Sequence, residues 1–362
     1  MAFVTIAAPK SPADIPLVGV SIKRARGNDK AYLVTDDQNI ALAKNVGAKL
    51  LRIDVYWADC ETQRGVYDFS SVKPLIDKAW KAGMQVLPIL ARGNRLYTGD
   101  WDKPAVTPEA RAAYAAFAVA AGRALGVPFL EIMNEPNNSE MLGGPVDPEA
   151  YGRLLNEVLL AMQAAGVKTP VIAGGLGVGG EGGFMAPKDF IARALPFVTA
   201  PGLRAWGVHP YTGADCYLSD PMMRPEAVQQ RSLSFRPAGV QTMVFNTEQG
   251  FSVKHCAGST LEQKRARQAV FATRFVLSAL TQWQMAIWYN LIDDGKDMNN
   301  VEQGFGLYDF DMKIKPAGLA FQAAMGLLNT CASVIVRKDG DLLQGLFKMP
   351  SGDTITLEAA PL

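Results

Sequence analysis

Residues 128–136 read PFLEIMNEP, a short apolar run that closes on a glutamate and a proline. A predominantly apolar run of this length is typical of a strand that is buried on both faces, as in a parallel sheet. The following segment Pro148–Ala165 has a proline near its start and repeats apolar residues at helical spacing. The two segments together predict one strand–helix unit.

The same unit recurs along most of the chain. We predict eight strands, at Leu17–Ile22, Ala48–Val55, Met84–Leu90, Pro128–Glu135, Val171–Gly175, Ala205–Tyr211, Thr242–Glu248 and Met285–Ile292. Helical patterns lie between them, as at Ser71–Ala82, Pro108–Leu125, Pro148–Ala165, Leu261–Thr281 and Pro316–Leu328. The repeat favours an α/β fold, the closed (β/α)8 or TIM barrel, over a doubly wound open sheet, which has fewer strands and a phosphate-binding first turn.

The periodicity changes near the end of the chain. Short alternating runs are separated by KDGD and PSGD turns, at Ala332–Arg337, Leu342–Lys348 and Thr354–Leu357. We therefore divide the chain into a leader segment, a barrel and a small C-terminal β-appendage, at residues 1–16, 17–330 and 331–362. Because three short strands are marginally stable alone, we expect them to pack on the barrel and to pair with the leader at Phe3–Ala7.

Composition narrows the class of function. Lys and Arg (36) nearly balance Asp and Glu (35), so the chain lacks the basic footprint of a nucleic-acid or anionic-membrane binder. No apolar run approaches the ~20 residues that cross a bilayer. Two histidines and four cysteines without CxxC spacing argue against a metal centre, and we expect neither a metal nor an organic cofactor.

Two further features of the sequence bear on location and loops. The apolar start lacks a basic segment, so we expect a secreted or periplasmic protein if a signal peptide was removed, and a cytoplasmic one otherwise. The glycine-rich residues 174–183 lack the Lys-Ser/Thr ending of a phosphate loop, and we interpret them as a loop that shapes a cleft.

Two predicted strands end in a glutamate, Glu135 on the fourth and Glu248 on the seventh. Active sites of (β/α)8 barrels lie at the C-terminal ends of the strands, so these carboxylates are candidate catalytic groups. The alternatives are a charge at a helix start for Glu135 and a simple ion pair for Glu248. Glu131 shares strand parity with Glu135, and we expect it to point into the barrel as a structural residue.

The sequence Asn134-Glu135-Pro136 on strand four, with a glutamate closing strand seven, resembles clan A of the glycoside hydrolases. FLEIMNEPNN and WGVHPYTG most resemble family 39, with family 5 second, over about residues 17–328. The resemblance implies a retaining glycosidase with Glu135 as general acid/base and Glu248 as nucleophile. Its substrate would be a carbohydrate with β-glycosidic bonds, in an exopolysaccharide or a cell-wall glycan.

The resemblance also implies roles for five other residues. Arg52 corresponds to the arginine near the nucleophile, and Asn134 to the residue that binds the sugar 2-hydroxyl. His209 and Tyr211, in GVHPY, correspond to the sixth-strand pair, whose tyrosine lies beside the nucleophile. Trp288, in AIWYN, corresponds to an aromatic residue that floors the sugar-binding subsite.

The chain departs from the family patterns at two places. The third strand ends LPILARGN, without the histidine that family 5 usually carries there, and FNTEQGF differs from the common family 39 wording. These departures leave the substrate open. The alternative function is a carbohydrate-binding barrel without catalysis, against which both glutamates and Asn134 argue.

We also expect a monomer. In an exported protein, Cys216 and Cys256 would form a disulfide, because they lie in neighbouring loops at the rim.

Overall fold

The structure, a computed structural model, describes residues 4–10, 16–24, 34–142, 144–177, 183–211, 242–282 and 285–360. Eight strands form a closed barrel in chain order. They are β2 (Leu17–Ser21), β3 (Leu50–Tyr56), β4 (Gln85–Ala91), β5 (Leu130–Asn134), β6 (Val171–Gly177), β7 (Leu203–His209), β8 (Met243–Gln249) and β9 (Met285–Trp288). Each overlaps one predicted strand, so the predicted barrel is confirmed.

The helices between the strands begin where the sequence places capping residues and prolines. Thr107 and Asp147 accept hydrogen bonds from the backbone amides of Ala110 and Ala150, and each is followed by a proline. The helices are α1 (Asp36–Asn45), α2 (Trp57–Cys60), α3 (Lys73–Lys81), α4 (Arg95–Thr98), α5 (Pro108–Leu125), α6 (Ser139–Leu142), α7 (Pro148–Ala164), α8 (Pro187–Ala194), α10 (Leu261–Gln282) and α11 (Pro316–Thr330). Within the described residues, none of these helices combines the length and the apolar character that a membrane span requires.

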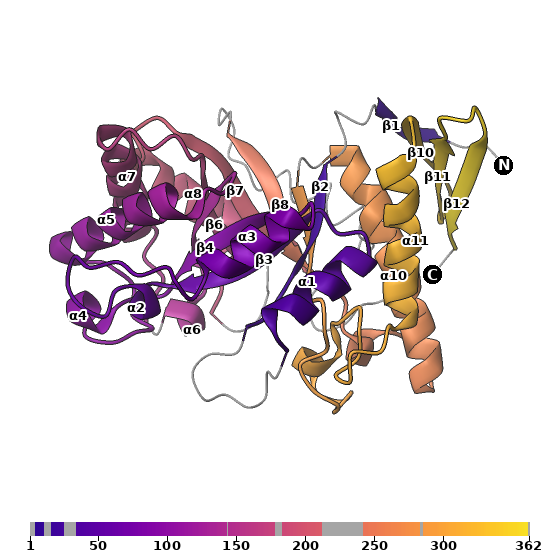
Figure 1. Cartoon of the computed structure of the whole chain (residues 1–362), viewed down its shortest axis with the longest axis horizontal. Helices are drawn as coiled ribbons and strands as arrows, with labels where there is room; N and C mark the ends of the chain where they lie inside the picture. The colour runs from indigo at the N-terminus through magenta and orange to yellow at the C-terminus, as the bar shows by residue number, and fades with distance from the viewer. Residues whose placement is uncertain are drawn as a thin grey trace. The chain divides into compact units, whose positions relative to one another are not determined.

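The described residues form two compact units. The central unit contains the described parts of residues 52–209 and 232–247, and the terminal unit those of residues 1–51, 210–231 and 248–362. In the central unit, α5 and α7 lie side by side over the parallel strands (Figure 1). The strands are buried on both faces, which explains why they are nearly continuous apolar runs.

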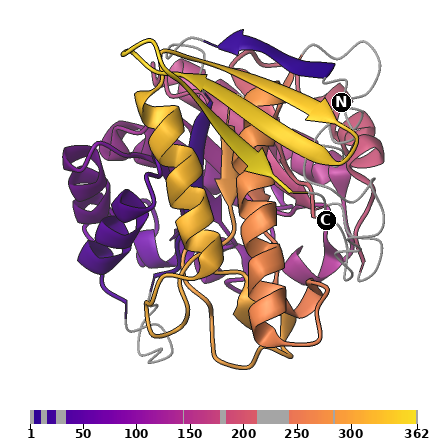
Figure 2. The ribbon, with the colours of Figure 1, turned by 90° about the vertical axis from the view of Figure 1, so that its right-hand side faces the viewer.

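The terminal unit carries a second sheet, in the order β1-β10-β11-β12. Its strands are β1 (Val4–Lys10), β10 (Ser333–Asp339), β11 (Leu342–Lys348) and β12 (Thr354–Ala359). β1 pairs antiparallel with β10, which confirms the expected pairing of the tail with the leader. Figure 2 shows the sheet lying over α10, whose buried Arg274 donates a hydrogen bond of 3.0 Å to the carbonyl oxygen of Ala360.

A buried ion pair fixes the segment that follows β9 in the terminal unit. The Lys315 ammonium lies 2.9 and 3.0 Å from the two carboxylate oxygens of Asp293, and Nζ also donates to the Gly304 carbonyl at 3.3 Å. The Gly306 amide donates to Asp293 at 2.6 Å. Burial raises the pKa of Asp293 to about 6, although the Lys315 charge acts to lower it. This pair connects the segment around residues 304–306 to the start of α11.

Asp293 should make stability depend on pH between about pH 4 and pH 6. Its folded-state pKa of about 6 lies above the unfolded value of about 3.9, so the folded protein holds the proton more tightly. Its contribution is therefore fully present below about pH 4 and is lost as the pH rises through about 6. Over this range, wild type should lose up to about 3 kcal/mol of unfolding free energy relative to Asp293→Asn.

Urea unfolding of both proteins at intervals from pH 4 to 7 measures this difference. Lys315→Met should move the transition to higher pH, because the ammonium that lowers the Asp293 pKa is gone. A stability difference between wild type and Asp293→Asn that stays constant across the range would contradict the prediction.

Candidate active site

Both predicted rim glutamates lie at the C-terminal ends of barrel strands. Glu248 is the penultimate residue of β8, and Glu135 directly follows β5. The backbone of Met133 and Glu135 has positive φ angles of 65° and 44°, so the chain turns sharply as it leaves the strand. A hydrogen bond of 2.9 Å from the Glu135 amide to the Gly175 carbonyl holds this turn against β6.

Asn137 secures the turn from the other side. Its side chain is fully buried and accepts a hydrogen bond from the Gly177 amide at 3.0 Å. Its Nδ2 donates to the carbonyl oxygens of Gly177 and Met185, each at 2.7 Å. No role was predicted for Asn137, whose only signal in the sequence is its place two residues after Glu135.

Arg52, on β3, joins three residues of the central unit. Its Nε donates to Glu131 at 2.7 Å, and its Nη2 donates to Asn134 Oδ1 at 2.8 Å and lies 3.2 Å from His209 Nε2. Arg52 is 3% exposed and Glu131 is 0% exposed, so this ion pair is buried. Glu131 is therefore buried and paired with a cation through Oε2, in agreement with the inward direction that the strand parity predicted, whereas its buried Oε1 has no hydrogen-bond partner among the described residues.

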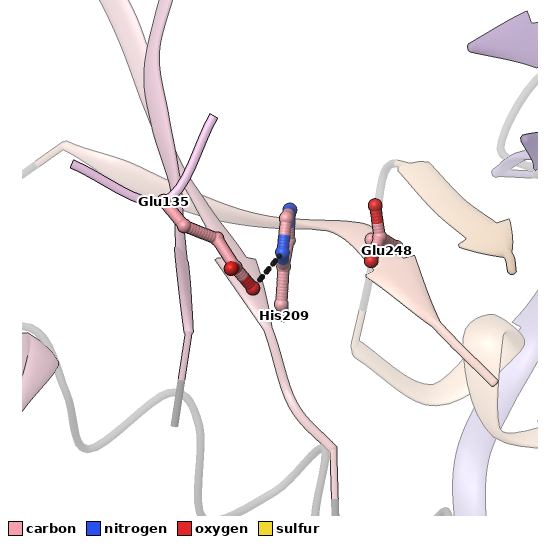
Figure 3. Close-up of side chains that lie close together, drawn as sticks. All are labelled: Glu135, His209 and Glu248. Carbon is pink, nitrogen blue, oxygen red and sulfur yellow. Dashed lines mark hydrogen bonds and ion pairs between the residues drawn. The ribbon is translucent and has the colours of Figure 1, made fainter. Parts of the chain in front are cut away.

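The contact with Arg52 fixes the tautomer of His209. A guanidinium only donates, so His209 Nε2 must accept and the ring proton must sit on Nδ1. Nδ1 then donates to Glu135 Oε1 at 2.9 Å, the hydrogen bond drawn in Figure 3. Oε2 of Glu135 takes no part in this hydrogen bond. Both ring nitrogens of His209 are thus engaged by protein groups, so neither offers a lone pair to a metal ion.

The terminal unit holds Glu248 next to a tyrosine. The Tyr211 hydroxyl donates to Glu248 Oε1 at 2.8 Å. The Tyr211 ring is half-buried and lies edge-on to Phe305 and Tyr289, at centroid distances of 5.9 and 6.5 Å. These ring contacts hold the Tyr211 side chain where its hydroxyl donates to Glu248.

Trp288 does not form the floor of a sugar-binding subsite, so this prediction from the sequence is wrong. Its ring is fully buried, with Nε1 donating to the Phe305 carbonyl at 3.1 Å. It packs at 5.4 Å from Phe275 of α10 and 6.4 Å from Phe321 of α11. Trp288 is the last residue of β9 and faces the helix layer, whereas the half-exposed Tyr289 follows it. Alternation along the strand was the signal that would have separated the two.

Gly175 is a glycine because His209 takes the place of its side chain. An added Cβ would lie 2.0 Å from His209 Nε2, a distance that no packing permits. Residues 178–182 of the glycine-rich segment lie outside the described residues, as does Cys216 of the expected disulfide.

Comparison with known proteins shows that the chain shares its fold with solved structures. No protein-family model matches the chain, and no curated protein matches its sequence. Among solved structures, it is similar to a family 39 glycoside hydrolase from Bacteroides cellulosilyticus WH2, with 19% identity over 97% of this chain and 80% of that one, at a TM-score of 0.67.

Two other solved structures have similar scores. For a monomeric β-xylosidase from Caulobacter crescentus CB15, the identity is 16%, the coverage 94% and 75%, and the TM-score 0.66. For a GH5_18 enzyme from Streptomyces cattleya in complex with GlcNAc, the identity is 16%, the coverage 87% and 81%, and the TM-score 0.61. Family 39 and family 5 were the two families suggested by the sequence motifs. At these identities, the likeness establishes the shared fold.

Breaking the buried Arg52–Glu131 pair should strongly destabilise the protein. Glu131→Leu leaves the buried guanidinium without its carboxylate, and we expect a loss of about 3–5 kcal/mol in the free energy of unfolding. The double variant Arg52→Met/Glu131→Leu should recover most of it, because no unpaired charge remains.

Denaturant unfolding measures both variants. The matched control is Glu109→Ala, which breaks the exposed pair with Arg64 and should cost less than about 1 kcal/mol. A Glu131→Leu protein as stable as this control would show that the pair contributes little.

His209 should be a neutral imidazole protonated at Nδ1. The chain has two histidines, so ¹⁵N NMR of wild type and of His255→Gln assigns the two rings and reports the tautomer. Gly175→Ala should change the His209 signals, because the new methyl group meets Nε2. Gly326→Ala, where an added Cβ meets nothing within 4 Å, is the control. A charged ring or an Nε2–H tautomer in wild type would contradict the assignment.

Proposed function

We propose that the protein is a retaining glycoside hydrolase of clan A that cleaves β-glycosidic bonds in an oligosaccharide or polysaccharide. The observation that carries the proposal is the position and environment of the two glutamates. They end the fourth and seventh barrel strands, and each has its own hydrogen-bond donor, His209 for Glu135 and Tyr211 for Glu248. The fold shared with enzymes of families 39 and 5 supports this reading.

In the first step, a Glu248 oxygen attacks the anomeric carbon while the bond to the leaving oxygen breaks. The leaving oxygen keeps the bonding electrons and takes the proton from Glu135 Oε2. The Tyr211 hydroxyl stabilises Glu248 as a carboxylate before attack. We expect Arg52 to add its positive charge to the same effect, as the family resemblance implies.

In the second step, water attacks the anomeric carbon and the ester bond to Glu248 breaks. Glu135, now a carboxylate, takes the proton of the water. The Nδ1–H of His209 donates to Oε1 in both steps, so it stabilises Glu135 while the charge is present. The acid and base roles thus fall to the same oxygen, Oε2, and the hydrogen-bonded oxygen stays in place.

Asn134 is positioned for a contact with the sugar. Its Oδ1 accepts from Arg52 at 2.8 Å, which orients the amide and leaves Nδ2 to donate. A donor at this position suits the 2-hydroxyl of the bound sugar, where hydrogen bonds strengthen in the transition state.

For the substrate we favour bacterial exopolysaccharide or plant cell-wall β-glycan, with β-xyloside as an alternative suggested by the Caulobacter crescentus β-xylosidase. That enzyme is monomeric, and we propose the same state for this chain.

The test is the stereochemistry and the distinct behaviour of the two variants. Proton NMR of the first-formed sugar should show the anomeric configuration of the substrate, because two displacements restore it. Glu248→Gln should be inactive on every substrate. Glu135→Ala should lose about 10²–10⁴-fold on substrates whose leaving group needs a proton, and azide should restore turnover on activated aryl glycosides.

Glu149→Gln, an exposed glutamate in the first turn of α7, is the control and should leave activity unchanged. An inverted first product would exclude the double displacement even if both glutamates proved essential.

A further inference from the structure

Arg92 lies at the candidate catalytic rim, where the family 5 pattern would have a histidine. It directly follows β4, the third barrel strand. The register of β4 on β5 pairs Leu90 with Ile132, so Arg92 is level with Asn134, one residue before Glu135. Its φ of 64° turns the backbone out of the strand, as at Glu135 on the neighbouring strand.

The guanidinium of Arg92 has neutral partners. Nη1 donates to the Met141 carbonyl at 2.7 Å, and Nη2 lies 3.4 Å from the Met141 sulfur. These contacts occupy two of its five N–H groups. Across the described ranges of the chain, no carboxylate forms an ion pair with this half-buried side chain.

Neighbouring arginines differ from Arg92 in this respect. Arg95, three residues on, pairs with Asp100 at 3.6 Å, and Arg52 pairs with Glu131 at 2.7 Å. A partly desolvated cation without an anion is unfavourable, and a bound anion would relieve that cost.

Trp101 lies beside this cation. Its half-exposed ring lies with its centroid 5.5 Å from the Arg92 guanidinium carbon. The loop is held tightly here, since the Gly93 amide donates to the Trp101 carbonyl at 2.7 Å. A Cβ at Gly93 would come 1.9 Å from the Lys103 carbonyl oxygen, so the close approach requires glycine.

We propose that Arg92 and Trp101 form a subsite for a sugar that carries a carboxylate, so that the substrate is an acidic glycan containing uronic acid. The planar guanidinium offers parallel N–H donors that match the two oxygens of a carboxylate. The indole offers an apolar face on which a sugar ring stacks. This inference rests on the proposed glycosidase function and specifies the substrate of the same site.

The test compares acidic glycans with the same glycans after their carboxyl groups are reduced to alcohols. The probes are glucuronoxylan, xanthan and gellan, each native and carboxyl-reduced, and the measurements are kcat/KM and binding affinity. Wild type should prefer the native form of its substrate by about 10- to 100-fold, the range expected for hydrogen bonds to a charged group. Arg92→Gln should lose this preference, so that its kcat/KM on the native glycan falls to about that on the reduced form.

Two further variants and a control separate the subsite from general damage to the fold. Arg92→Lys, which keeps the charge but not the planar fork, should retain part of the preference. Trp101→Ala should weaken binding of native and reduced glycans alike. Arg95→Gln removes the same charge from a more exposed neighbour and should discriminate as wild type does. Melting temperatures of all variants check that they are folded.

The outcomes distinguish this inference from the proposed function. Hydrolysis without any preference for the carboxylate, or a preference that survives in Arg92→Gln, would overturn the subsite and leave the glycosidase intact. Carboxylate-dependent binding without hydrolysis of any glycan would support the subsite and count against the proposed function. Absence of both hydrolysis and carboxylate-dependent binding across the panel would overturn both.

Discussion

The guanidinium of Arg52 is the fixed point of the central unit. Its charge is buried and must be neutralised, so Glu131 is held in place beneath it. The remaining N–H groups then set the orientation of Asn134 and the acceptor nitrogen of His209. Asn134 and His209 are each oriented by their contact with Arg52. The buried ion pair, which fixes Arg52, therefore also determines how these two side chains are oriented.

The contacts of Arg52 also determine, through His209, how the Glu135 carboxylate at the rim is held. Because Nε2 of His209 accepts a hydrogen bond from Arg52, Nδ1 carries the ring proton and donates a hydrogen bond to Glu135. In this chain of contacts a positive charge is separated from Glu135 by a neutral ring. The imidazole keeps the carboxyl group oriented without placing a full charge against it.

The sequence predicted the barrel well because the barrel depends on local patterns. Buried parallel strands and Pro-initiated helices leave strong signals, and α5 begins and ends at the predicted residues, Pro108 and Leu125. The glutamates were found for the same reason, since a polar residue that closes an apolar run stands out. The pairing of β1 with β10 followed from the marginal stability of isolated strands.

The features that the sequence did not predict depend on the direction in which side chains point, and not on where their residues lie along the chain. Trp288 and Tyr289 are adjacent aromatic residues, and the alternation along β9 directs Trp288 to the helix layer. Asn137 satisfies backbone groups that come together only after the chain has turned at Glu135. The neutral surroundings of Arg92 are a property of loops packed around it.

The pairing of β1 with β10 has a consequence for the order of events in the cell. Thr5 is matched with Arg337, so residues 11–332 lie between the two strands along the chain. During synthesis β1 leaves the ribosome before β10 has been made. The edge of β1 is therefore unpaired during that time. The pairing of β1 with β10 therefore closes a long loop, which costs chain entropy and slows its formation. A nascent chain of this protein carries an exposed β1 edge until β10, Ser333–Asp339, has been synthesised.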